Sequence, residues 1–167
     1  MMRRLAFGLL GSALIFGQAQ AADKCASQGD RETFDLAALK SEMMVLATSC
    51  HQEDRYNAVI QRFKPELLAN EKVFDAYFKR VYGRGGQSEH DAYVTSLANA
   101  QSDVGLKQGM DFCPHTDVIF DEALAVPNGK DLVQYAAAKD LIPESLGPCV
   151  GPVAVTRASA THTTKKK

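Results

Sequence analysis

TFDLAALKSEMMVLATSC, residues 33 to 50, is the stretch of sequence that decides the fold. Its apolar residues recur at steps of three and four, which is the spacing of one face of an α-helix. They are Leu36, Leu39, Met43, Leu46 and Cys50. Thr33 or Asp35 is expected to cap the start, because each side chain can accept a hydrogen bond from a free amide of the first turn. The stretch therefore predicts a helix over 33–50, with Cys50 on its buried face.

The same spacing recurs along the rest of the chain. The apolar residues that carry it are Tyr56, Val59, Ile60, Phe63 and Leu67, then Val73, Phe74, Tyr77, Phe78 and Val81, then Tyr93, Leu97, Ala100 and Val104, then Phe120 and Leu124, and finally Leu132, Tyr135, Ala136 and Leu141. No strand-like alternation of useful length interrupts them. The sequence predicts an all-α fold, a single irregular bundle of five to six short helices.

Individual residues suggest where these helices begin and end. Pro65 must kink the second helix or begin another, because it has no amide hydrogen and clashes with the preceding turn. Asn70 is expected to cap the third helix, and Ser88-Glu89-His90-Asp91 resembles a capping box for the fourth. Gly83 stands where a left-handed residue commonly ends a helix. The glycine-rich run 83–86 is interpreted as a flexible connection, since no phosphate-binding pattern surrounds it.

The first 21 residues have the pattern of an export signal. Arg3 and Arg4 precede an apolar run from Leu5 to Gly17, and Ala19-Gln20-Ala21 is a small-x-small cleavage signature. The run is shorter than the about 20 residues that a membrane-spanning helix needs. We predict a Sec-type signal peptide over 1–21, cleaved after Ala21, and a periplasmic or secreted protein.

The rest of the chain divides into a predicted helical domain, 22–150, and a tail, 151–167. The tail is predicted to be disordered because it is rich in Gly, Pro, Ala, Ser and Thr and has few apolar anchors. A formal net charge of −1 predicts no binding to nucleic acid. The expected partner is another envelope or secreted protein, and no membrane span is predicted. The sequence leaves the oligomeric state open.

Four cysteines follow the predicted cleavage site. An even number in an exported chain favours disulfides over metal or redox sites. Cys50 and Cys113 both adjoin predicted helices, whereas Cys25 and Cys149 lie in irregular segments flanking the helical body. We favour a Cys50–Cys113 bond inside the bundle and a Cys25–Cys149 bond between its ends. The alternative is the sequential pairing, Cys25–Cys50 with Cys113–Cys149.

A zinc site is the first chemical alternative for these cysteines. Cys50, His51, Cys113 and His115 supply enough sulfur and nitrogen ligands for tetrahedral zinc. Adjacent side chains on a helix diverge by about 100°, however, so Cys50 and His51 do not readily converge on one ion. We predict neither a metal nor a cofactor.

A hydrolase is the least favoured function. Cys113 and His115 could form a nucleophile and its base, but a free thiol would leave an odd number of cysteines to pair. Glu53 and Asp54 could act as an acid pair, yet paired catalytic carboxylates face each other across a substrate and are not usually sequence neighbours. No catalytic residue is predicted.

The favoured function is an interaction or accessory module of the cell envelope without catalysis of its own. The alternative is a carrier of a small apolar ligand, held in a helical pocket lined by Phe63, Phe74, Phe78 and Tyr93. The chain has no tryptophan, so these rings must also supply much of the bulk of the core. A ligand-sized cavity among these four residues would favour the carrier, and tightly filled space among them would argue against it.

Overall fold

The computed structural model describes residues 26–116 and 118–148, without the side chains of His115 and Thr116, and over them the predicted all-α fold is confirmed. The helices are α1 (Gln28–Cys50), α2 (Glu53–Arg62), α3 (Lys64–Tyr82), α4 (Gly86–Gln108), α5 (Phe112–Thr116), α6 (Val118–Ala125) and α7 (Gly129–Lys139). Short 3-10 turns span Gly83–Gly85, Gly109–Asp111 and Glu144–Leu146. The predicted signal peptide, the tail and the Cys25–Cys149 pairing lie outside the described residues.

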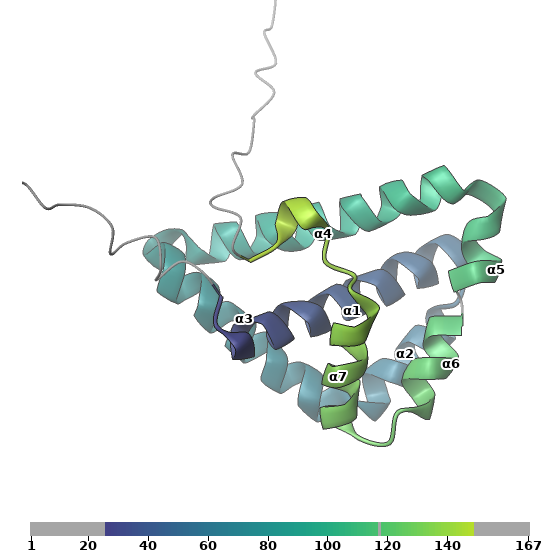
Figure 1. Ribbon diagram of the computed structural model, residues 1–167, viewed down its shortest axis with the longest axis horizontal. Coiled ribbons are helices and arrows are strands. Elements are labelled where there is room, and N and C mark those ends of the chain that lie inside the picture. The colour runs from purple at the N-terminus through teal and green to yellow at the C-terminus, as the bar shows by residue number, and fades with distance from the viewer. Residues whose placement is uncertain (1–25, 117, 149–167) are drawn as a thin grey trace, which may run out of the picture.

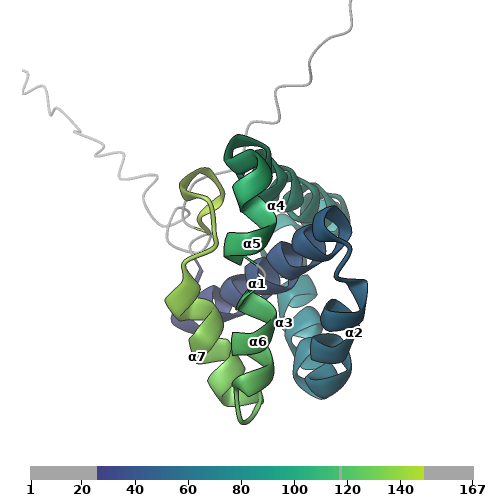
Figure 2. The same ribbon diagram turned by 90° about the vertical axis from the view of Figure 1, so that its right-hand side faces the viewer.

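Helix α1 is the centre of the bundle. Figure 1 shows it between α3 and α4, with α7 crossing it, and it contacts α2 and α5 as well. Figure 2 shows α4 and α5 on one side of α1. Helices α2, α6 and α7 lie on the other side. Because α1 has neighbours on several sides, it buries more than the one face that its sequence pattern predicted. Its buried residues include Phe34, Ala38, Ser41 and Val45 in addition to the predicted stripe.

The start of α1 is a capping box formed by Ser27 and Asp30. The Asp30 amide donates to Ser27 Oγ at 3.2 Å, and the Ser27 amide donates to the Asp30 carboxylate at 2.8 Å. Burial alone would raise the pKa of Asp30, but hydrogen bonds from Ser27 and from Arg80 of α3 outweigh it and lower that pKa. The predicted cap at Thr33 or Asp35 is wrong, because the pair that caps the helix, Ser27 and Asp30, precedes the apolar run.

The junctions of α2, α3 and α4 confirm two predictions and correct a third. Pro65 lies in the first turn of α3, so it begins a new helix and does not kink one. Gly83 ends α3 with a φ of 57°, as expected. Asn70 does not cap a helix; it lies inside α3 and its side-chain amide donates to the carbonyl of Thr33, 3.1 Å away. Its bonding to α1 replaces the local bond that a cap would make.

The predicted capping box at Ser88 is also wrong, because α4 already begins at Gly86. The glycine-rich run is a 3-10 turn that leads directly into the helix. A Cβ on Gly86 would lie 2.9 Å from both Lys79 Cα and the Phe78 carbonyl oxygen. Glycine at this position therefore allows the start of α4 to approach the backbone of α3, which places the two helices side by side.

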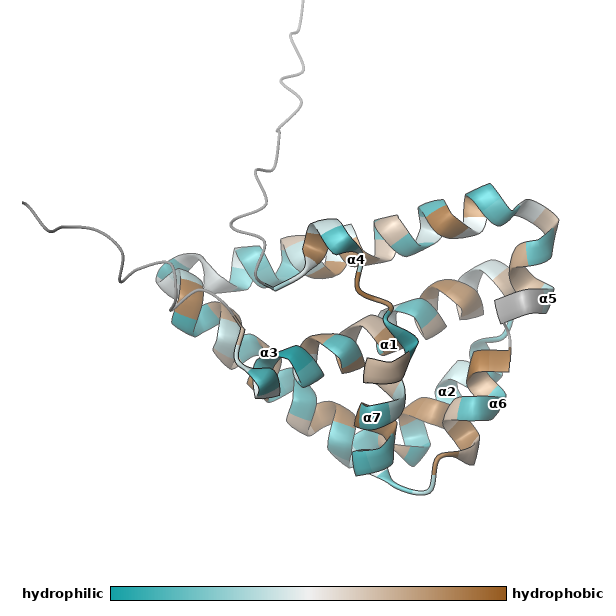
Figure 3. Ribbon diagram, in the orientation of Figure 1, coloured by the Kyte–Doolittle hydropathy of each residue, from teal (hydrophilic) through white to brown (hydrophobic). Residues whose placement is uncertain are grey.

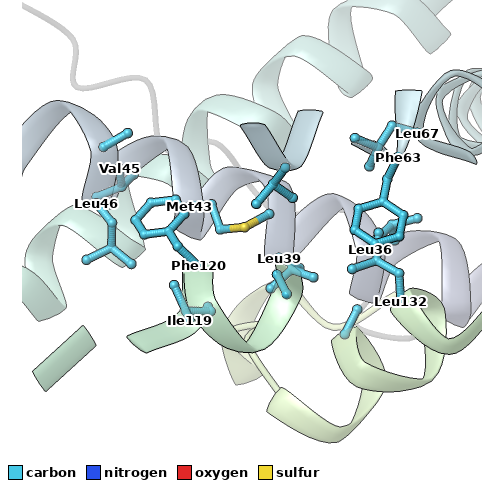
Figure 4. Packing of buried hydrophobic residues seen from close by; sticks show 14 of the residues in the cluster. Leu36, Leu39, Met43, Val45, Leu46, Phe63, Leu67, Ile119, Phe120 and Leu132 are labelled. Atoms are coloured by element: carbon cyan, nitrogen blue, oxygen red, sulfur yellow. The ribbon is translucent and has the colours of Figure 1, made fainter. Parts of the chain in front are cut away.

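The larger core joins α1 to α2, α6 and α7 (Figure 4). In the close-up, Met43 and Leu46 lie near Phe120, and Leu36 lies near Phe63. Cys50 and Cys113 are partly buried against this core and form a disulfide that joins the end of α1 to α5. The predicted Cys50–Cys113 pairing is thus confirmed, and the rival pairing of each with another cysteine is excluded in this structure.

A second core consists of aromatic rings from α1, α3 and α4. Phe34 lies at its centre, with its ring centroid between 4.9 and 6.0 Å from those of Phe74, Tyr77, Phe78 and Tyr93. Three of these four contacts are edge-to-face, an arrangement that aromatic quadrupoles favour. This core fixes α3 and α4 against the first half of α1.

The hydropathy of the residues is mixed along the helices. Hydrophilic and hydrophobic residues alternate along α1, α3 and α4 (Figure 3). Within residues 26–116 and 118–148, no helix has the length and apolar character needed to cross a membrane.

Candidate functional site

A cavity of about 330 Å³ lies between α1, α3 and α4, next to the aromatic core. Six apolar residues line it: Ala37, Met44, Leu67, Phe74, Val94 and Leu97. The polar lining residues are Lys40, Ser41, Asn70, Glu71, His90, Asp91 and Thr95. The cavity therefore combines an apolar wall with a polar side, as pockets for small molecules usually do.

Hydrogen bonds between helices hold the polar side in place. Ser41 Oγ of α1 donates to Gln101 Oε1 of α4 at 2.6 Å, and the Gln101 amide donates to the carbonyl of Ala38 at 3.0 Å. The Lys40 ammonium donates to Glu71 Oε2 of α3 at 3.1 Å. These bonds connect α1 to both neighbouring helices, so the shape of the cavity does not depend on apolar contacts alone.

His90, in the second turn of α4, is the buried titratable side chain of this region. Its side chain is 11% exposed, and its ring packs edge-on against Phe74 and Phe78, with centroids 5.0 and 5.4 Å away. Nδ1 lies 3.2 Å from Asp91 Oδ1. A carboxylate only accepts, so the tautomer with the hydrogen on Nδ1 donates to Asp91 and leaves a lone pair on Nε2.

Nε2 of His90 points towards two carboxylates of α3. It lies 3.5 Å from Glu71 Oε1 and 3.7 Å from Asp75 Oδ1, and it makes no hydrogen bond with any of the described residues. Glu71 and Asp75 are one helical turn apart and therefore share a face of α3. One ligand atom from each of the three side chains lies within 4.8 Å of the others, so this set could hold a metal ion.

The sequence contained only a weak sign of this cluster. The spacing of Glu71 and Asp75 places two acids on one helix face, but so do many solvent-exposed pairs. His90 was interpreted as part of a capping box. Its position opposite the two acids depends on the close approach of α3 and α4, which sequence spacing does not reveal.

A second hollow, of about 470 Å³, lies beside the start of α4 and shares His90 with the first cavity. Its lining has no large apolar side chain and consists of Asp75, Lys79, Gly83, Arg84, Gly86, Gln87 and His90. Such a lining suits water and ions better than an apolar ligand.

The predicted four-residue pocket is not formed as a unit. Phe74, Phe78 and Tyr93 do come together, but in a packed aromatic core, and Phe63 belongs to the other core. Only Phe74 of the four lines the cavity of about 330 Å³. The hollows that touch Phe78 and Tyr93 on their other sides measure about 40 Å³ each. The available space therefore lies beside these rings and not among them.

The other candidate residues form no common site among the described side chains. Cys50 and Cys113 are bonded to each other, so neither sulfur is a thiolate that could attack a substrate or bind zinc. His51 is exposed at the left-handed end of α1, and the side chain of His115 lies outside the described part. Glu53 and Asp54 are exposed in the first turn of α2.

Glu42 of α1 is a partly buried acid with a shifted pKa. Burial raises the pKa of its carboxyl to about 7. The folded state therefore keeps a proton that the unfolded state releases between about pH 4.5 and 7. The contribution of Glu42 to stability is most favourable below this window, and it is lost as the pH rises through it.

Glu42→Gln should remove this pH dependence. We expect the variant and the native chain to have the same free energy of unfolding near pH 4. Near pH 8 the variant should be more stable by about 2 kcal/mol. This figure is smaller than the full linkage value because the side chain of Glu42 is partly exposed. Urea denaturation at both pH values measures the difference. Glu32→Gln, at an exposed position of the same helix, is the control. A constant difference between the Glu42 variant and the native chain at both pH values would contradict the assignment.

The fold and the cavity define a disulfide-linked helical bundle with an amphipathic pocket between α1, α3 and α4. No protein-family model, curated protein or solved structure matches this chain significantly.

Proposed function

We propose that this protein binds a small, largely apolar ligand in the cavity between α1, α3 and α4, and acts as a carrier without catalysis of its own in the cell envelope. The observation that carries the proposal is the cavity of about 330 Å³ with an apolar wall and a polar side. This volume lies at the lower end of the range typical of small-molecule sites, about 300–1,000 Å³. The assignment to the envelope rests on the predicted signal peptide and is supported by the disulfide.

The charges at the polar side narrow the chemistry of the ligand. Lys40 is already paired with Glu71, and Asp91 adds a further negative charge. A ligand carboxylate would meet two acids and only one cation that already has a partner. An apolar body with a neutral hydrogen-bonding end or a positively charged end therefore fits this cavity best.

Filling the cavity should prevent binding. In Val94→Phe a larger side chain projects from α4 into the cavity, and we expect the affinity for the fluorescent apolar amine N-phenyl-1-naphthylamine to fall about tenfold or more, as lost contact of about 1.4 kcal/mol implies. Fluorescence titration measures the affinity. Val104→Phe is the matched control, because Val104 lies on the same helix, is exposed and does not line the cavity. Equal probe affinity in the two variants, both shown to be folded, would contradict the proposal.

A protein-interaction module is the second candidate. It is supported by Leu106 and Met110, which are 80% and 96% exposed around the end of α4. Exposed apolar side chains that lie close together often mark a contact surface. A stoichiometric envelope protein that co-purifies with the native chain, but not with Leu106→Asp, would favour this function over the carrier.

A further inference from the structure

We propose that Glu71, Asp75 and His90 form a binding site for a zinc ion. Tetrahedral zinc with bonds of about 2.0–2.1 Å places neighbouring ligand atoms about 3.4 Å apart. His90 Nε2 lies 3.5 Å from Glu71 Oε1 and 3.7 Å from Asp75 Oδ1. Both distances from His90 are therefore close to the spacing that the ion requires, and the two carboxylate oxygens lie within 4.8 Å of each other.

The hydrogen bonding of His90 gives a second, independent reason. The buried Nε2 lies beside two carboxylate oxygens and makes no hydrogen bond with any described residue, and in the tautomer that donates from Nδ1 to Asp91 it carries a lone pair. In that tautomer, three acceptor atoms converge there without a donor between them. These atoms repel one another, and a cation bound between them removes the repulsion. The cation is either a metal ion or a proton on Nε2.

The surroundings of the cluster resemble the outer shell of a metal site. A metal-bound histidine usually donates its other ring hydrogen to a carboxylate, which fixes the orientation of the ring. Asp91 has this role for His90, and the Gln87 side chain donates to the same Asp91 oxygen at 2.9 Å. Lys40 holds the second oxygen of Glu71, which leaves Oε1 directed at His90.

The donor set selects the kind of ion. Calcium takes six to eight oxygen ligands, more than this site supplies, whereas zinc accepts one imidazole nitrogen and two carboxylate oxygens. The side chains of Glu71 and Asp75 are 41% and 55% exposed, so an ion can enter from solvent. Three protein ligands leave the fourth tetrahedral position for water or a ligand atom.

Calorimetric titration with zinc chloride tests the site on the full exported chain, oxidised, without an affinity tag and freed of metal by dialysis against a chelator. We expect Asp75→Asn and His90→Gln to weaken zinc binding at least about 100-fold, because mutation of a residue that only hydrogen-bonds to a metal ligand already lowers metal affinity 10–100-fold. Asp103→Asn, an exposed acid of α4, is the matched control and should bind as the native chain does. Because Asp75 is half-exposed, its variant should melt at the native temperature.

A spectroscopic measurement separates the metal from the proton. Zinc should shift the Nε2 resonance of His90 in nitrogen NMR of the native chain and leave it unchanged in Asp75→Asn. A ring with hydrogens on both nitrogens that ignores added zinc, or identical titrations of the native chain and Asp75→Asn, would overturn the proposal. Val94→Phe should still bind zinc, so failure of the carrier proposal and failure of the zinc site are distinguishable.

Discussion

Replacing Cys50 and Cys113 together by alanine is expected to lower the free energy of unfolding by roughly 4 kcal/mol. The two residues are 63 positions apart, and the bond between them restricts a long loop of the unfolded chain. The chain-entropy treatment assigns roughly 4 kcal/mol to a loop of that length. Since domains of this size have a total stability of about 5–15 kcal/mol, the loss should be large enough to dominate a denaturation curve.

Urea denaturation of the native and the doubly substituted chains measures this loss. The native chain treated with a reductant is the control. The free energy of unfolding of the reduced native chain should equal that of the variant if only the Cys50–Cys113 bond stabilises the fold. It should be lower than that of the variant if a Cys25–Cys149 bond also contributes. A loss of less than about 1 kcal/mol in the variant would contradict the stabilising role of this crosslink.

Phe34→Ala should cost about 4 kcal/mol, within the range of 3–5 kcal/mol for removal of a fully buried phenylalanine. Phe34 is 1% exposed, and its ring contacts four others from α3 and α4. Removal of the ring leaves a cavity between three helices and takes away several edge-to-face contacts. Because the Phe74 ring contacts both Phe34 and His90, removal of the Phe34 ring should also make the position of His90 beside Glu71 and Asp75 less fixed.

Thermal and urea denaturation measure this effect. Phe34→Leu keeps most of the apolar volume, so its free energy of unfolding should fall clearly less than that of the alanine variant. It replaces the alanine variant in the measurement if that variant does not fold. Val73→Ala, at a half-exposed position of α3, is the surface control and should change stability by less than about 0.5 kcal/mol. If Phe34→Ala lost no more than the Val73 variant, the aromatic core would not be what holds α3 and α4 to α1.

Local patterns predicted the parts of the fold that depend on neighbouring residues. The helical spacing over 33–50 is confirmed inside α1, and the disruptive ring of Pro65 and the positive φ of Gly83 are found at helix boundaries. Helix starts were predicted less well. Ser, Thr, Asn and Asp are common in this chain, and only the completed packing decides which of them caps a helix. Asn70 shows this, since its side chain bonds to the backbone of α1.

The candidate site was less predictable than the fold. The sequence pointed to aromatic residues, and three of the four do gather, but their rings fill the space that a ligand would need. The cavity instead lies between α1, α3 and α4, and its lining includes the smaller side chains of Ala37 and Val94. Side-chain volume and helix separation together determine such a gap, and neither follows from residue spacing.

By itself, the sequence determined the helical class, because apolar periodicity is a property of single segments. It favoured the Cys50–Cys113 pair through the position of Cys50 on the buried stripe but left a rival pairing open, which the structure excluded. Only the tertiary structure decided that His90 meets Glu71 and Asp75. That meeting requires α3 and α4 to pack closely at Gly86, where a side chain would collide with the backbone of α3. Contacts between segments arise from the packing of whole helices, so no single stretch of the chain contains them.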